Sequence, residues 1–260
     1  MEFEPSIRAE PFQFTMQTMF IGMTIFAFLL GLVVLGIRFA QDSEREHACL
    51  NNFKQVALGV LQYERTWSSL PPAAYTVDTQ GRRMQSWRVS ILPYLVSNTV
   101  YNKYHPDEPW DGPNNCRLHG EYMPEYRCPA DLSELRTATN ILAVVGPGTA
   151  WPGTTPSCSK NCAKGASQTA LVVEVANSGI HWMEPRDLEL SSFDPTINGR
   201  SGRCLSSNHA GGVNVAMADG SVRCLSPNTS PEVLKAVLMT GKSDDVLSDK
   251  PTQNTQPLEP

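Results

Sequence analysis

The chain begins with a long apolar stretch. No charged side chain lies between residues 11 and 37, and residues 19–37 (MFIGMTIFAFLLGLVVLGI) are almost wholly apolar. Crossing a bilayer takes about 20 apolar residues. A cleaved secretory signal would have an apolar core of roughly 7–15 residues behind a basic segment, whereas the leader MEFEPSIRAE is acidic. A buried core helix is the other alternative. The pattern favours one membrane-spanning helix over about residues 16–39.

The helical pattern continues beyond this span. Apolar residues recur on one face at helical spacing, at Leu50, Phe53, Ala57, Val60 and Leu61. No proline occurs between residues 15 and 67, and Pro71 and Pro72 then forbid further helix. The sequence therefore predicts one helix over residues 14–67. Its first half would lie in lipid, and its second half would offer an apolar stripe to a folded domain.

The remaining chain combines short helices and strands. Residues 86–104 predict two short helices broken at Pro93. Short apolar runs predict strands at residues 141–145, 170–175 and 213–218. Ser230, followed by Pro231, is a typical helix start, and Gly241 is a suitable stop. The expected fold class is α+β and pilin-like, with a long membrane-spanning helix packed on an antiparallel sheet.

The domain boundaries follow from these elements. We expect a short cytoplasmic N-terminus over residues 1–13, followed by the long helix. A globular α+β domain is expected over residues 68–241. The polar, proline-bearing residues 242–260 predict a disordered tail.

A hairpin is expected around Asp219 and Gly220, because Asp-Gly between alternating residues favours a tight turn. Alternation along the first strand divides its side chains between two faces. Val213, Val215 and Met217 are predicted to pack toward the long helix. Asn214, Ala216 and Ala218 are predicted to face away from it.

Charge and cysteine content give opposite indications of orientation. A net charge of -5 argues against a general nucleic-acid binder. Basic residues are more frequent after the span than before it, which would place the large domain in the cytoplasm. Seven cysteines, however, are typical of an oxidising compartment. Composition leaves this conflict open.

The cysteines suggest a disulfide framework. Proximity along the chain favours the pairs Cys116–Cys128, Cys158–Cys162 and Cys204–Cys224. Cys49 would remain free or available to a partner chain. A zinc site at the C-x3-C pair is disfavoured because no suitable histidine lies nearby, so no metal site is expected.

Several blocks of the chain resemble the planctomycete family of pilin-like proteins named for its H-x9-DG motif. The matching blocks are CLNNFKQVALGVLQYE, SWRVSILPYL, YNKYHPDEPWDGPNN, YRCPAD, NILAVVGPGTAWPG, TALVVEVANSGIHWMEPRDL and SSNHAGGVNVAMADGSVRCLS. His209, Asp219 and Gly220 are the residues of the naming motif. The family has no known molecular function, and its N-terminus is similar to those of type II secretion pseudopilins and type IV pilins. The resemblance implies a cytoplasmic N-terminus and a periplasmic or cell-surface domain.

One part of the family pattern is missing. Pilin-like precursors have Gly, then Phe-Thr-Leu, and a Glu at the fifth mature position, where a peptidase cuts and methylates. Here Gln13 replaces the Gly and Thr18 replaces the Glu, although Phe14 and Thr15 are kept. This departure favours a permanently anchored protein over a filament subunit.

The polar residues do not form a recognised catalytic motif. Candidate groups are His209, Asp219, Glu174, Asp187 and His181, but no hydrolase, zinc-protease or phosphate-loop signature accompanies them. The turn explains Asp219, and a hydrogen bond within the fold explains His209. Glu174 lies in an apolar strand, where an inward carboxylate would need a partner. We therefore expect no enzyme; an enzyme using His209 and Glu174 remains the minority alternative.

A structural or interaction module at the cell envelope is the preferred function. Its expected partners are the lipid bilayer, through the helix, and either further copies of itself or envelope proteins; a binding module would bind its partner through the outer domain. The alternative is a ligand- or glycan-binding module, with Glu174, Trp182 and Asp187 as candidate binding residues. Five tryptophans supply exposed or packing aromatic rings: Trp67, Trp87, Trp110, Trp151 and Trp182. No cofactor is expected, although pseudopilins of the G type carry calcium, for which Asp219 could supply one ligand.

The missing Gly and Glu predict an unprocessed N-terminus. Mass spectrometry of the purified protein should recover residues 1–13 attached to the helix. A chain that begins at Phe14 with a methylated amine would contradict this expectation.

Overall fold

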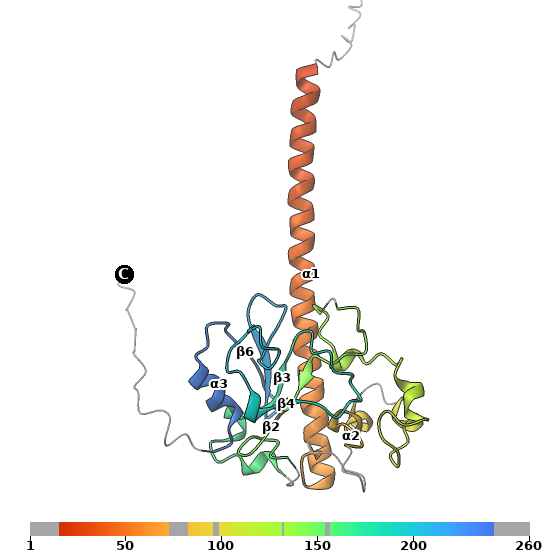
Figure 1. Ribbon diagram of the computed structural model, residues 1–260. Helices are drawn as coiled ribbons and strands as arrows, with labels where there is room; N and C mark the ends of the chain where they lie inside the picture. The colour runs from red at the N-terminus through yellow and green to blue at the C-terminus, as the bar shows by residue number, and fades with distance from the viewer. Residues whose placement is uncertain (1–15, 73–82, 96–98, 132, 154–156, 242–260) are drawn as a thin grey trace, which may run out of the picture. The chain divides into compact units, whose positions relative to one another are not determined.

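The structure is a computed structural model that describes residues 16–72, 83–95, 99–131, 133–153 and 157–241 (Figure 1). The predicted N-terminal segment 1–13, residues Phe14 and Thr15 and the predicted tail 242–260 lie outside this part of the chain. The chain divides into two compact units, Met1–Glu44 and Arg45–Pro260.

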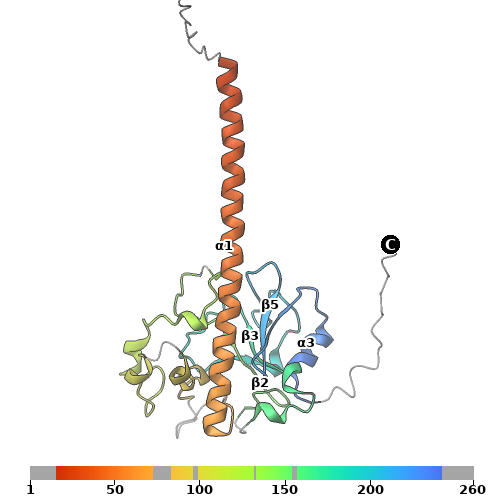
Figure 2. The same cartoon turned by 180° about the vertical axis from the view of Figure 1, so that it is seen from behind.

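Helix α1 runs from Met16 to Trp67 and contributes to both units (Figures 1 and 2). In the first unit its apolar side chains are exposed. This part is long and apolar enough to cross a membrane, and none of it is buried. In the second unit one face of α1 is fully buried, including Cys49, Phe53, Val56 and Val60. The change from exposed to buried apolar residues follows the two patterns in the sequence.

A four-stranded antiparallel sheet forms the centre of the second unit, in the order β1-β3-β5-β6. Its strands are β1 (Ile141–Leu142), β3 (Ala170–Glu174), β5 (Val213–Met217) and β6 (Val222–Leu225). Two further strands, β2 (Val144–Val145) and β4 (Leu188–Glu189), pair in parallel. An α+β fold is therefore confirmed.

The strand predicted over residues 141–145 is divided in two. Ala143 separates β1 from β2, because its N–H donates to the Asp187 carboxylate and its carbonyl accepts from the Leu188 N–H. This contact comes from a distant segment, so the local pattern could not show it.

Short helices complete the second unit. They are α2 (Trp87–Ser90) and α3 (Pro231–Leu238), where the Ser230 hydroxyl caps α3 by accepting from the Val233 N–H. Pro93 lies at the start of a 3-10 turn rather than between two helices, because proline is well suited to a first helical position. The 3-10 turns are Leu92–Tyr94, Tyr101–Lys103, Asn115–Leu118, Pro124–Tyr126, Ser159–Asn161, Ala166–Gln168 and Leu190–Ser192.

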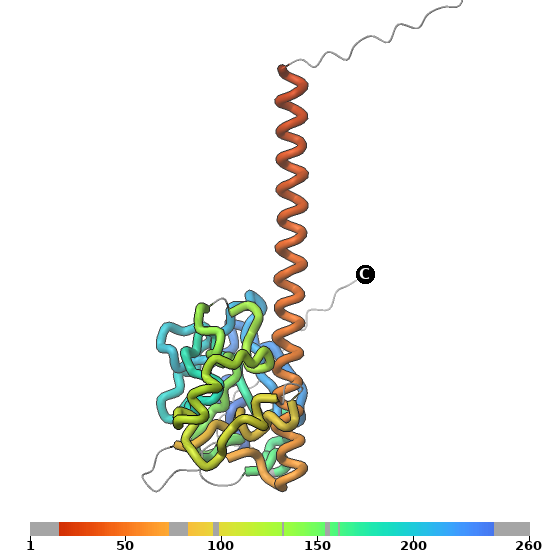
Figure 3. The backbone as a smooth tube through the Cα atoms, turned by 90° about the vertical axis from the view of Figure 1, so that its right-hand side faces the viewer, coloured from red at the N-terminus to blue at the C-terminus, as the bar shows by residue number. Residues whose placement is uncertain are grey.

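The two faces of β5 pack in the opposite sense to the prediction. Val213, Val215 and Met217 share a core cluster with Leu234 and Leu238 of α3. The other face points to α1: Ala216 shares a cluster with the helix, and the Asn214 amide donates to Cys49 Sγ. The second unit lies along one side of the α1 segment that belongs to it (Figure 3). The small and polar side chains take the face nearest the helix, and the larger ones fill the core beneath α3.

The Asp-Gly turn joins β5 to β6 as predicted. Asp219 Oδ1 accepts from the backbone N–H and the hydroxyl of Ser221. Gly220 has a φ of 86°, and a Cβ there would lie 3.2 Å from a methyl group of Leu61. The turn therefore needs glycine both for its backbone conformation and for its contact with α1.

A buried ion pair organises the core beside α2. The guanidinium of Arg88 donates to Asp187, and both side chains are completely buried. Asp187 also accepts from the Trp87 indole at 3.2 Å and from the Ala143 N–H at 2.8 Å. Asp187, a candidate binding residue, is thus enclosed in the protein interior.

Replacing Asp187 with alanine should lower stability by about 3–5 kcal/mol, because the Arg88 charge would stay buried without its partner. Thermal unfolding of the full-length protein in detergent measures this. Glu189→Ala is the matched control, since its ion pair with Arg83 is exposed and should contribute little. Equal melting temperatures for the two variants would contradict the assignment.

Candidate metal centre

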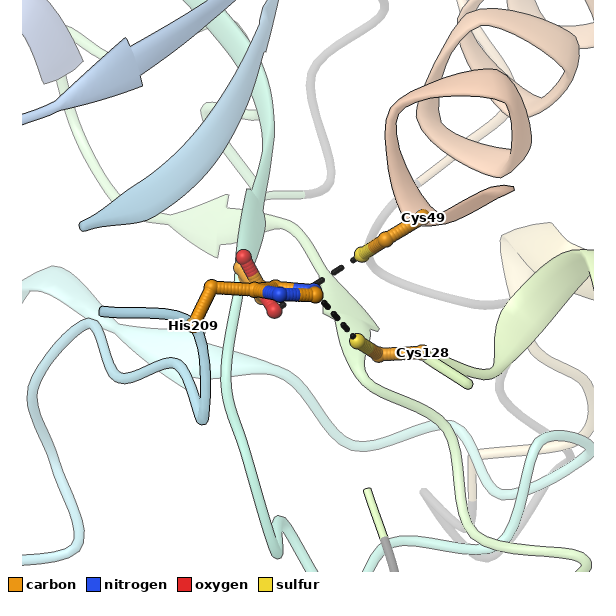
Figure 4. A group of neighbouring side chains, drawn as sticks. Cys49, Cys128 and His209 are labelled. Carbon is orange, nitrogen blue, oxygen red and sulfur yellow. Dashed lines mark hydrogen bonds between the residues drawn. The ribbon is translucent and has the colours of Figure 1, made fainter. Parts of the chain in front are cut away.

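Four side chains with metal-binding atoms meet in the second unit. They are Cys49, Cys128, Glu174 and His209, and their ligand atoms all lie within 4.8 Å of one another. In Figure 4 the two sulfur atoms and the His209 ring point toward a common centre. Cys49 and Glu174 are fully buried, Cys128 is nearly so, and His209 is half-buried. The group is therefore an interior cluster that reaches the surface only through His209.

The four residues come from four separate segments. Cys49 lies on the buried face of α1, and Glu174 is the last residue of β3. Cys128 follows the 3-10 turn Pro124–Tyr126, and its N–H donates to Asn140 Oδ1 at 2.8 Å. His209 precedes β5, and its N–H donates to Ser207 Oγ at 3.1 Å. Only the tertiary fold brings these segments together.

Two contacts measure the size of the cluster. His209 Nε2 lies 3.2 Å from Cys128 Sγ, and Cys49 Sγ lies 3.8 Å from Glu174 Oε1. Around a tetrahedral zinc ion with ordinary bond lengths, neighbouring ligand atoms would be about 3.4–3.8 Å apart. The spacing of these donor atoms is therefore close to that of a four-coordinate ion.

Hydrogen bonds fix the Glu174 carboxylate. Oε1 accepts from the Ser207 hydroxyl at 2.9 Å, and Oε2 accepts from both the backbone N–H and the side-chain amide of Asn214 at 2.9 Å. The Asn214 amide also lies 3.5 Å from Cys49 Sγ. Partners of this kind orient ligands in metal sites. Binding of an ion by the Cys49 thiolate would remove the S–H that points at Oε1 and free that oxygen for the same ion.

The acid–base properties of the cluster are strongly perturbed. The hydrogen bonds with Cys49, first, and with His209 together outweigh burial and lower the pKa of Cys128 to about 5. The hydrogen bond with Cys128 raises the pKa of both Cys49 and His209. Burial raises the pKa of Glu174 to about 7, and the nearby Cys128 acts in the same direction. Without a cation, the cluster cannot hold all of its negative charges.

The donor set indicates which kind of ion would fit. Two sulfurs, one imidazole nitrogen and one carboxylate oxygen suit zinc and similar transition metals. Calcium takes 6–8 oxygen ligands, so this cluster does not suit it. Two thiolates and a carboxylate would carry three negative charges in the interior, which a divalent cation would largely offset.

The other candidate site residues lie outside this cluster. Asp219 is exposed on the hairpin turn. His181 Nε2 contacts the His119 carbonyl at 3.0 Å, and the buried Trp182 indole donates to the Glu121 carbonyl at 3.0 Å. Trp182 therefore has a structural partner. Of the predicted catalytic and binding candidates, His209 and Glu174 come together, and Cys128, predicted to form a disulfide, lies with them.

The predicted disulfides are not present. All seven cysteines have free thiols in the structure. Cys128 lies beside Cys49 and His209 rather than Cys116, whose thiol donates to the Asp111 carbonyl. Cys204 donates to the Gly199 carbonyl, and Cys224 is exposed on β6; Cys158 and Cys162 flank a 3-10 turn as free thiols. Cys49, predicted to be either free or available to a partner chain, is free and buried.

The sequence pattern did not predict that Cys49 and Cys128 lie in one cluster. Proximity along the chain was the wrong guide, since these two residues are far apart in sequence. One signal was present: each of the four cluster residues lies in a block that carries the family resemblance. Polar residues from separate blocks that lack a local explanation are candidates for one shared site.

Comparison with known proteins places the chain in a family. Residues 40–161 and 149–232 match the family described as "Protein of unknown function (DUF1559)". No curated protein and no solved structure matches the chain. The matched residues include Cys49, Cys128, Glu174 and His209, and they cover well over half of the sequence. The chain therefore belongs to this family of proteins of unknown function.

Proposed function

We propose that the protein is a membrane-anchored module of the cell envelope whose folded unit holds one zinc-type divalent ion. The ligands are Cys49, Cys128, Glu174 and His209. One observation carries the proposal: four donor atoms of suitable chemistry, from four distant segments, lie within 4.8 Å of one another in the interior. The first half of α1 supplies the anchor.

The ion has a structural role. Four protein ligands complete a tetrahedral zinc shell and leave no position for a substrate, as in other closed sites. The ion joins α1 to β3 and to the loops that contain Cys128 and His209. Because the unfolded chain has no such site, binding free energy contributes directly to folding.

A cysteine nucleophile is the competing function. The Cys128–His209 contact of 3.2 Å resembles an activated thiolate. However, Cys128 is buried, and the second thiol and the carboxylate occupy the space beside it. A substrate would have to displace these groups, so metal binding accounts better for all four residues.

A pilin-like role is a second candidate. The continuous helix α1 favours it, because its exposed apolar part and its buried part lie on one element, as expected of pilin-like proteins. The antiparallel sheet of the second unit agrees with this architecture. In this role the N-terminus is cytoplasmic, the folded unit is periplasmic or at the cell surface, and copies associate through their helices.

The metal proposal predicts one zinc ion per chain. Full-length protein, purified in detergent with a reductant and reconstituted with zinc, should contain one equivalent by elemental analysis. X-ray absorption should show two sulfur and two nitrogen or oxygen ligands. Removing zinc with a chelator should lower the melting temperature, because the buried charges lose their counterion.

Matched variants make this test specific. Cys128→Ser and His209→Ala should lose the ion, and their melting temperatures should no longer respond to the chelator. His209→Ala should also cost about 1–3 kcal/mol or more, because a buried partner is lost. The controls Cys116→Ser and His105→Ala replace exposed residues outside the cluster and should keep the ion. A reconstituted wild type that retains no more zinc than Cys128→Ser would overturn the proposal.

The pilin-like role predicts contact between copies through α1. A photoreactive residue in place of the exposed Leu29 should yield crosslinked dimers and larger species in membranes. The same group at Leu135, exposed on the folded unit, should not. Monomers alone from both positions would exclude helix-mediated assembly and leave the metal proposal untouched.

A further inference from the structure

A second feature of the folded unit is a cavity of about 590 Å³ near the end of α1. Its walls include Tyr63 and Trp67 of α1 and three tyrosines that follow later in the chain: Tyr94, Tyr101 and Tyr104. This volume lies within the usual range for ligand pockets, roughly 300–1,000 Å³. None of the metal-cluster residues lines the cavity, so it is a separate site.

The walls are aromatic and uncharged. Pro93 and Pro106 add rigid apolar surface, and Gln85 and Ser90 add neutral polar groups. No Asp, Glu, Lys or Arg is among the described residues that line it. A neighbouring cavity differs in this respect, because Glu64, Arg65 and Lys160 line it. The aromatic cavity therefore suits a ligand without charge.

Two aromatic rings in this cavity are unusually exposed. Trp67 is 64% exposed and Tyr101 is 44% exposed. In contrast, Trp87, Trp151 and Trp182 are buried, and their indole N–H groups donate to protein acceptors. Exposed tryptophan and tyrosine are the residue types that dominate binding energy at interfaces.

The cavity wall also contains an unpaired hydroxyl. Tyr104 is only 8% exposed, and its buried hydroxyl has no hydrogen-bond partner. A buried polar group without a partner is costly, and such groups are uncommon in folded proteins. A ligand carbonyl that accepts from this hydroxyl would remove the deficit.

These features point to a particular ligand conformation. A polyproline II segment has no internal hydrogen bonds, so its carbonyls are free to accept from tyrosine and tryptophan donors. Its proline rings pack on aromatic walls, as in other domains that bind proline-rich segments. We propose that this cavity binds an uncharged proline-rich segment of a partner protein in the polyproline II conformation. A sugar is the competing neutral ligand, but the strong acceptors for its hydroxyls are few: among the described lining residues Gln85 supplies the only side-chain amide and none supplies a carboxylate.

Titration of the full-length protein in detergent with decaproline tests this proposal. Binding should be saturable, should change tryptophan fluorescence and should be absent for a glycine–serine peptide of the same length. Trp67→Ala should weaken binding by about tenfold or more, the factor that corresponds to loss of about 1.4 kcal/mol. The control Tyr122→Ala removes an exposed aromatic ring outside the cavity and should leave affinity unchanged.

Tyr104→Phe separates binding from stability. It removes only the unpaired hydroxyl, so the melting temperature should stay the same or rise while decaproline affinity falls. Three outcomes would overturn the proposal: no saturable binding of decaproline, unchanged affinity in both Trp67→Ala and Tyr104→Phe, or binding of a neutral oligosaccharide in place of the peptide. The titrations are run with and without added zinc, so their outcome is independent of the metal proposal.

Discussion

The folded unit is organised around one buried carboxylate. Glu174 ends an apolar strand at full burial, where an isolated negative charge would be strongly unfavourable. The structure surrounds it with donors from Ser207 and Asn214, and places Cys49 and His209 close by. The packing of α1 against the sheet brings Cys49 to this carboxylate, and the segment before β5 brings His209 to it. A divalent ion would complete this arrangement, because Glu174 would then be one ligand beside Cys49, Cys128 and His209 while Ser207 and Asn214 keep the carboxylate oriented.

The elements with local patterns could be predicted from the sequence. The helical spacing of Leu50, Phe53 and Ala57, the Asp219–Gly220 turn and the cap at Ser230 each depend on neighbouring residues, and the structure has all three features. The proximity of Cys49 and Cys128 could not be predicted in this way. Cys128 is drawn to Cys49 by the packing of α1 against the sheet, a contact that spacing along the chain does not encode.

The faces of β5 illustrate the same limit. Alternation correctly divides the strand into two sets of side chains, but it does not identify which set faces which partner. The larger set could be assigned to the long helix only on the assumption that the helix covers the most apolar face. In the structure α3 covers that face, and Asn214 is needed beside Glu174 on the other. The face of β5 that carries Asn214 therefore lies toward α1, where Asn214 donates to Glu174.

The four cluster residues leave the ribosome one after another during synthesis. A ribosome releases Cys49 first, then Cys128 and Glu174, and His209 last. Until His209 emerges, the earlier three ligands form an incomplete shell, and an ion bound to them keeps a position open to solvent or to other thiols. The proposed site can therefore close around an ion only near the end of synthesis. Before that point, the nascent chain would present two thiols, Cys49 and Cys128, that the folded unit conceals.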